Sequence, residues 1–231
     1  MSLLLQIQSV PDSLINPEIT EKTLSVVDLI TSGGIGGNLV MGALGILSIF
    51  AVYILIERFS AITKASKEDE NFLKSIQNFV EAKDIEAAKT LCRNTDSPIS
   101  RMIEKGVNRI NKPMTDISAA IENQGKLEVF KMENNLANLA TISGAAPMIG
   151  FLGTVIGMIV AFHEMASAGG NIDVEMLSKG IYTAMTTTVA GLIVGIIAFI
   201  AYNYLVSKVD KVVFMLEAKT TEFLDLLHHN E

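Results

Sequence analysis

Hydrophobic residues dominate three long stretches of the chain, and none of the three contains an Asp, Glu, Lys or Arg. A helix that crosses the hydrocarbon core of a bilayer needs about 20 mainly apolar residues. The stretches cover 29–56, 134–162 and 180–207, with their most apolar parts at 39–56, 142–162 and 189–206. A buried helix of a soluble protein could explain one such stretch, but three in a short chain predict three membrane-spanning helices.

The segments between and after these stretches have mixed, helical patterns. Residues 57–113 predict several short helices, one opening at Asp84 and another at Pro98, packed as a small bundle. From Thr115 the pattern stays helical up to Pro147, which predicts one long helix that continues into the second span. The tail after Ser207 carries an apolar stripe at helical spacing and is expected to continue the third span. The stripe consists of Val209, Val213, Leu216, Phe223 and Leu227.

The N-terminal segment is expected to lie outside the spans. Leu24 and Val27 belong to a short amphipathic pattern, and the glycines at 33, 34, 36 and 37 predict a break before the first span. The start of the chain lacks the basic region of a secretory signal, so the internal helices are expected to drive insertion. The predicted organisation is a periplasmic N-terminal segment (1–37), a first span (38–56), a cytoplasmic helical domain (57–113), a long helix including the second span (114–166), a periplasmic loop (167–178), and a third span with a cytoplasmic C-terminal helix (179–231).

The positive charges orient these spans. Of 18 Lys and Arg residues, 13 lie between 57 and 141 and three in the C-terminal tail. Cytoplasmic loops carry the excess of Lys and Arg, so this side is predicted to be cytoplasmic and the N-terminus periplasmic. Arg58 and Lys208, which lie close to span ends, agree with this orientation.

Composition narrows the function. The mean hydropathy is +0.40, 49% of residues are hydrophobic, and the 231 residues include 17 Gly and no Trp, a blend typical of packed membrane helices. A net charge of −7 argues against nucleic acid as a partner. The single Cys92 offers neither a disulfide nor a zinc cluster. Without a phosphate loop, metal-spaced histidines or a nucleophile elbow, the sequence predicts neither an enzyme nor a cofactor or metal site.

Small and hydroxyl residues mark the second and third spans. Glycines at helical spacing let helix backbones approach closely in lipid, and this packing role is assigned to Gly150, Gly153, Gly157, Gly191 and Gly195, together with Pro147. Thr154, Thr183, Thr187 and Thr188 are polar enough to line a wet path without the cost of a buried charge. Each threonine could instead bond a carbonyl of its own helix and be structural.

Carboxylates are missing from the most apolar part of every span, so conduction would need a partner's acid. Two charged pairs, Glu57–Arg58 and His163–Glu164, end the first and second spans and are interpreted as interfacial anchors.

The span sequences TISGAAPMIGFLGTVIGMI (141–159) and KGIYTAMTTTVAGLIVGIIAFIAYN (179–203) resemble the MotA/TolQ/ExbB proton-channel family, nearest its ExbB and TolQ branch. The resemblance covers roughly 40–215 and includes LIERF after the first span. Thr154 and Thr188 match the family's pore-lining threonines. Thr183 stands where ExbB-like members often carry Glu, and Ile197 replaces a Pro common in ExbB.

The resemblance implies a fold and a function. The expected fold is an all-α integral membrane protein with three transmembrane helices, two of them extended into the cytoplasm, in a homopentameric ring. This ring would surround helices of an ExbD- or TolR-like single-span partner, whose membrane Asp carries the proton. The expected function is an inner-membrane stator driven by the proton motive force, working through a TonB-like protein in uptake.

Other functions remain open from the residues alone. Envelope maintenance or surface motility could be driven in place of uptake, by H⁺ or Na⁺. A non-conducting membrane scaffold that anchors a partner helix is the main alternative. A secondary transporter is disfavoured, because the chain lacks an inverted repeat with paired broken helices.

Overall fold

The computed structural model describes residues 34–66, 70–167 and 174–229. Within these ranges every element of regular secondary structure is an α-helix, which confirms the predicted all-α class. The helices are α2 (Gly34–Ala65), α3 (Glu70–Glu81), α4 (Ile85–Asn94), α5 (Pro98–Val107), α6 (Met114–Glu133), α7 (Leu136–Ser167) and α8 (Val174–His229). The N-terminal pattern around Leu24 and Val27 and the connection at 168–173 lie outside the described residues.

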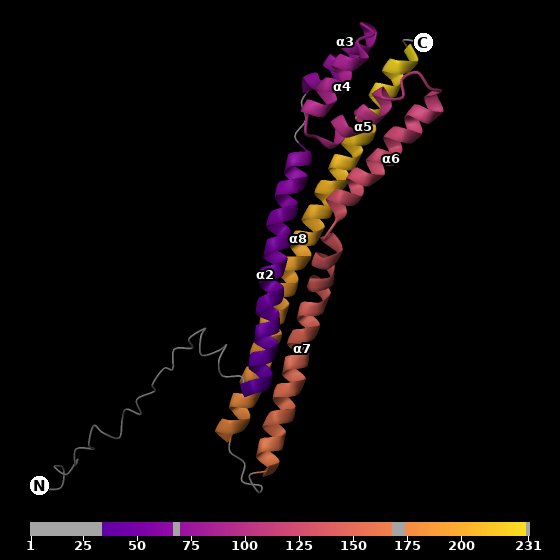
Figure 1. The fold of residues 1–231 in the computed structure, drawn as a ribbon. Helices are drawn as coiled ribbons and strands as arrows, with labels where there is room; N and C mark the ends of the chain where they lie inside the picture. Colours follow the sequence, from indigo (N-terminus) through magenta and orange to yellow (C-terminus); the bar gives the residue numbers. More distant parts are fainter. Residues whose placement is uncertain (1–33, 67–69, 168–173, 230–231) are drawn as a thin grey trace, which may run out of the picture.

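Three long helices, α2, α7 and α8, lie side by side along the molecule, and α3 to α6 gather around the C-terminal half of α8 (Figure 1). The three-helix part contains the three segments that are long and apolar enough to cross a membrane. Its outward faces are apolar, with side chains such as Ile49 and Met148 exposed. Such faces suit contact with lipid or other apolar surfaces, so the chain is a multi-pass membrane protein.

The glycines near the start of α2 do not break the helix, contrary to the sequence-based expectation. α2 begins at Gly34 and includes Gly36 and Gly37. A Cβ at Gly36 would lie 2.8 Å from a methyl of Ile156, and one at Gly37 would lie 3.3 Å from a methyl of Thr183. These glycines let α2 pack closely against α7 and α8.

A break at Asn134 and Asn135 divides the helix that the sequence predicted over 114–166. α6 ends at Glu133 and α7 begins at Leu136. Asn135 has a φ of 66°, in the left-handed region that Asn tolerates better than most non-glycine residues. The polar helix α6 therefore leaves the line of α7, and Figure 1 shows the change of direction.

α8 is a single helix of 56 residues, about 84 Å long at 1.5 Å per residue. It begins at Val174, so part of the connection predicted over 167–178 is helical. From the end of the apolar span onward, Leu205, Val209, Leu216 and Phe223 are buried. Through this stripe the C-terminal half of α8 supports α5 and α6.

Candidate functional site

The contact between α7 and α8 depends on residues without large side chains. A Cβ at Gly150 would lie 2.8 Å from the carbonyl oxygen of Thr187, and one at Gly191 would lie 2.6 Å from that of Ala146. A Cβ at Gly195 would lie 2.6 Å from the ring of Pro147. The two backbones thus meet directly, as small residues allow in membrane helices.

Gly153 and Gly157 extend this contact along α7. A Cβ at Gly153 would lie 2.5 Å from the hydroxyl oxygen of Thr187, and one at Gly157 would lie 3.0 Å from the Cβ of Ala184. All six residues that the sequence assigned to helix packing therefore lie in the α7–α8 contact of a single chain.

Three threonine hydroxyls meet in this contact. The hydroxyls of Thr154 on α7 and Thr188 on α8 are hydrogen-bonded to each other. The carbonyl oxygen of Ala184 lies 3.2 Å from the Thr154 hydroxyl, and that of Gly150 lies 3.1 Å from the Thr188 hydroxyl. Because each hydroxyl has one proton, one of the pair donates to the other and the second donates to its carbonyl oxygen. The Thr187 hydroxyl lies 2.8 Å from the Ala184 carbonyl oxygen and 3.3 Å from that of Gly150.

The burial of these threonines differs. Thr187 and Thr183 are buried, whereas Thr154 and Thr188 are half-buried. Thr183 lies one turn before Thr187, and its methyl group faces Gly37 of α2. A hydroxyl donates one hydrogen bond and accepts up to two, so the half-buried pair retains acceptor capacity for water or an approaching acid.

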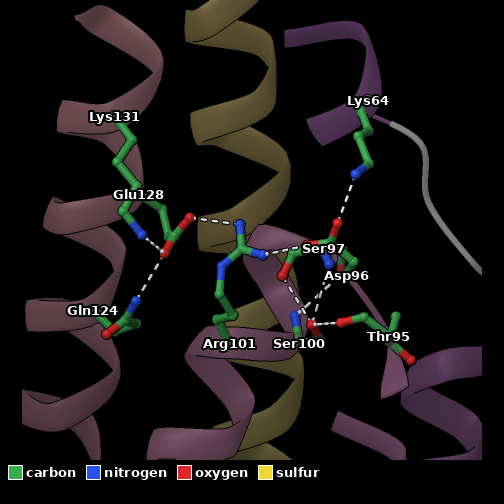
Figure 2. A network of polar contacts seen from close by, with 9 residues as sticks. All are labelled: Lys64, Thr95, Asp96, Ser97, Ser100, Arg101, Gln124, Glu128 and Lys131. Carbon is green, nitrogen blue, oxygen red and sulfur yellow. Dashed lines mark hydrogen bonds and ion pairs between the residues drawn. The ribbon is translucent and has the colours of Figure 1, made fainter. Parts of the chain in front are cut away.

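Sequence analysis missed a charged cluster among the short helices that pack around the C-terminal half of α8, and Figure 2 shows this cluster from close by. The carboxylate of Glu128 on α6, whose side chain is only 2% exposed, accepts hydrogen bonds from Arg101 (2.7 Å), Lys131 (2.9 Å) and Gln124 (2.8 Å). Arg101 also binds Asp96 (2.9 Å), which pairs with Lys64 at the end of α2 (2.6 Å). The cluster thus ties α2, α5 and α6 together.

The electrostatics of this cluster favour its ionised form. Burial raises the pKa of the Glu128 carboxyl, but hydrogen bonds and charge from Arg101 and Lys131 outweigh it and hold that pKa below its usual value. The hydrogen bond to Glu128 raises the pKa of Arg101. Gln124 and Lys131 stand four before and three after Glu128, a helical spacing that could have indicated a paired carboxylate in the sequence.

The pair Glu57–Arg58, interpreted from sequence as an interfacial anchor, has a further contact. The two side chains are ion-paired, and Arg58 is also hydrogen-bonded to the carbonyl oxygen of Lys131. Because this bond joins α2 to the end of α6, the pair belongs to the packing between helices as well.

Comparison with known proteins agrees with this architecture. Residues 94–218 match the model of the MotA/TolQ/ExbB proton channel family. An ExbB homolog of biopolymer transport from Methanothermobacter thermautotrophicus is 27% identical over 80% of this chain and 64% of its own length. Biopolymer transport protein ExbB of Helicobacter pylori is 40% identical over 34% of this chain and 54% of its own length. The chain thus spans less than two thirds of either relative.

A third relative matches nearly end to end. The Tol-Pal system protein TolQ of Pseudomonas aeruginosa is 24% identical over 92% of this chain and 96% of its own length. The family match covers more than half of the chain and includes the Thr154–Thr188 pair and the α7–α8 glycines. The chain therefore belongs to the MotA/TolQ/ExbB proton channel family.

Proposed function

We propose that this chain is the ring-forming subunit of an inner-membrane motor driven by the proton motive force. In this proposal five copies surround helices of an ExbD- or TolR-like single-span protein, and the complex energises periplasmic or outer-membrane work, such as TonB-dependent uptake. The N-terminus lies in the periplasm and the C-terminus in the cytoplasm. Family membership and the three long apolar helices support the proposal.

The observation that carries the proposal is the hydroxyl pair of Thr154 and Thr188. It is half-buried within an apolar helix pair whose spanning part contains no Asp or Glu. A hydroxyl can hand a hydrogen bond to water or to a carboxylic acid, whereas a buried carboxylate would be costly here. The ion pathway is therefore assigned to Thr154 and Thr188, with Thr187 and Thr183 along the same helix, and a partner's acid supplies the titrating group.

The main alternative is a scaffold that conducts nothing. It is favoured by one specific observation: each of the three clustered hydroxyls lies within hydrogen-bonding distance of a helix carbonyl oxygen. Under this alternative the threonines only hold α7 against α8.

Substitution at the pair separates the two functions. Thr→Val keeps the shape of the side chain and removes its hydroxyl. The double variant Thr154→Val, Thr188→Val should therefore abolish the ion-driven activity of the complex reconstituted with its single-span partner. Native mass spectrometry should find the same oligomer as for the original chain. Thr→Ser at both positions should retain activity. Thr186→Val is the matched control, because among the described residues the Thr186 hydroxyl bonds only the Tyr182 carbonyl oxygen of its own helix (2.9 Å). Full activity of the double valine variant would contradict the ion-pathway role and leave these threonines with the packing role alone, whereas absence of ion-driven activity from the original complex would support the scaffold.

A further inference from the structure

A groove between α2 and α8 opens on the outer face of the helical bundle, away from the threonine pair. It has a volume of about 560 Å³ and is lined almost wholly by apolar side chains. Ile56, Phe59 and Ser60 of α2 and Ile197, Ile200 and Tyr204 of α8 line it. Ile56 and Ile200 are each 63% exposed, so the groove is open on the surface of one chain.

One end of the groove is positively charged. The rings of Phe59 and Tyr204 are stacked 6.2 Å apart, and the ammonium of Lys208 lies 4.1 Å from the centre of the first ring and 5.3 Å from that of the second. Directly beyond is a pocket of about 300 Å³, lined by Lys208 and Lys211 together with Ser66, Ser207 and Tyr204.

These two lysines have room for an anion. Lys208 donates to the Thr63 hydroxyl (3.3 Å), and no carboxylate among the described residues lies within ion-pair distance of Lys208 or Lys211. Two ammonium groups and two serine hydroxyls around one pocket are suited to the oxygens of a phosphate.

The length of the groove matches one leaflet. Ile197, at the deep end, and Lys208 are eleven residues apart on α8, which corresponds to about 16 Å along a helix. Half of a hydrocarbon core is about 15 Å. Aromatic side chains at the boundary and lysines just beyond it are the arrangement that membrane proteins use at the headgroup level.

We propose that this groove binds an anionic phospholipid, with an acyl chain between α2 and α8 and the phosphate on Lys208 and Lys211. The apolar lining alone would accept any acyl chain or a second copy of this protein. The lysine pair with its serine hydroxyls selects the anionic headgroup, and it lies on the side of the membrane that carries α3 to α6.

The absence of tryptophan from the sequence permits a direct test. Ile56→Trp places a single tryptophan in the groove, and Tyr53→Trp, one turn earlier on α2 and exposed outside the groove, is the matched control. Full-length protein is reconstituted into phosphatidylcholine vesicles that contain increasing fractions of either dibrominated phosphatidylglycerol or dibrominated phosphatidylcholine. Bromine quenches tryptophan fluorescence on contact and so reports which lipid occupies each position.

For Ile56→Trp, we expect half-maximal quenching at a fraction of the anionic lipid that is about tenfold lower than the fraction needed of the zwitterionic lipid. The reason is that two lysines lie near the headgroup and attract its negative charge. Adding Lys208→Gln and Lys211→Gln should abolish this preference, whereas Lys105→Gln with Lys112→Gln, an equal change of charge on exposed residues elsewhere, should preserve it. Tyr53→Trp should show no preference.

Two results would overturn the proposal. Equal quenching of Ile56→Trp by both lipids would mean that the groove does not distinguish headgroups. Quenching of Tyr53→Trp but not of Ile56→Trp would mean that protein, such as a second copy of the chain, covers the groove instead of lipid.

Discussion

Arg58 of α2 donates a hydrogen bond of 2.9 Å to the carbonyl oxygen of Lys131, in the last turn of α6 and 73 residues further along the chain. Its neighbour Glu57 accepts a longer hydrogen bond (3.5 Å) from the side chain of Asn135, within the helix break itself. Because Glu57 and Arg58 are also ion-paired, one turn of α2 contacts both the end of α6 and the break. These contacts of α2 stabilise the junction between α6 and α7.

Removal of the Arg58 guanidinium should loosen this junction. Arg58→Met keeps a long side chain but leaves Glu57 and the Lys131 carbonyl without their partner, a loss of about 1–3 kcal/mol. We expect faster amide hydrogen exchange in 132–136 than in the original chain, measured by mass spectrometry. Arg109→Met, at an exposed arginine between α5 and α6, should leave this exchange unchanged. Equal exchange in both variants would mean that Arg58 does not hold the break.

The buried carboxylate of Glu128 should make stability depend on pH. Its pKa is lower in the folded protein than in the unfolded chain, so ionised Glu128 stabilises the fold above the unfolded pKa of about 4.3, and this stabilisation is lost as the pH falls through the folded pKa. Glu128→Gln should thus reduce the free energy of unfolding at pH 7 by about 1–3 kcal/mol and lower Tm accordingly. The difference in Tm between this variant and the original chain should shrink below about pH 4. Glu133→Gln, at an exposed position, is the control. A difference in Tm that is independent of pH would contradict this role.

The glycine contacts between α7 and α8 predict which substitutions unfold a single chain. At Gly150 and Gly191 a side chain would collide with the backbone of the facing helix, so Gly150→Leu or Gly191→Leu should cost about 1–3 kcal/mol or more and lower Tm in detergent. Gly144→Leu is the matched control on α7, because a Cβ there meets nothing within 4 Å in the chain. If Gly144→Leu leaves Tm unchanged but lowers the fraction of protein in the oligomer, then that face of α7 contacts another subunit. Unchanged Tm in all three variants would contradict the packing role.

Cysteine labelling tests the orientation. Ser66, after α2, and Ser167, at the end of α7, are both exposed. With Cys92 replaced, an impermeant thiol reagent added outside cells should label Ser167→Cys and not Ser66→Cys, because in the proposed orientation the Lys- and Arg-rich side faces the cytoplasm. The native Cys92 should itself remain unlabelled near neutral pH, since burial raises the pKa of its thiol to about 12. Labelling of Ser66→Cys from outside would reverse the topology.

The sequence predicted the spans because each is a long uncharged stretch, and that signal depends only on local composition. The break at Asn134 and Asn135 escaped notice because two asparagines interrupt the apolar pattern no more than other polar residues do, and neither is Gly or Pro. The glycines of α2 were misinterpreted for the opposite reason. Glycine breaks an isolated helix, but here Gly36 and Gly37 meet side chains of α7 and α8, and that contact depends on the tertiary structure.

The candidate site was predictable only in part. Spacing along one helix grouped Thr187 and Thr188 with the glycines, but it could not show that Thr188 bonds Thr154 of α7 and that Thr183 turns toward α2. The contact of Arg58 with Lys131 could not be predicted from the sequence for the same reason. It requires the position of α6 relative to α2, which the break at Asn135 determines.

The uninterrupted course of α8 has a mechanical consequence. Thr188 and Leu227 are separated by 39 residues, or about 58 Å of continuous helix, and every hydrogen bond between them resists torsion. A rotation of α8 about its axis at Thr188 must therefore turn Leu227 through a similar angle. α6 and α7 do not share this torsional rigidity, because dihedral changes at Asn134 and Asn135 can absorb the same twist. Rotation within the membrane would thus reach the far end of the molecule through α8, while α6 keeps its orientation.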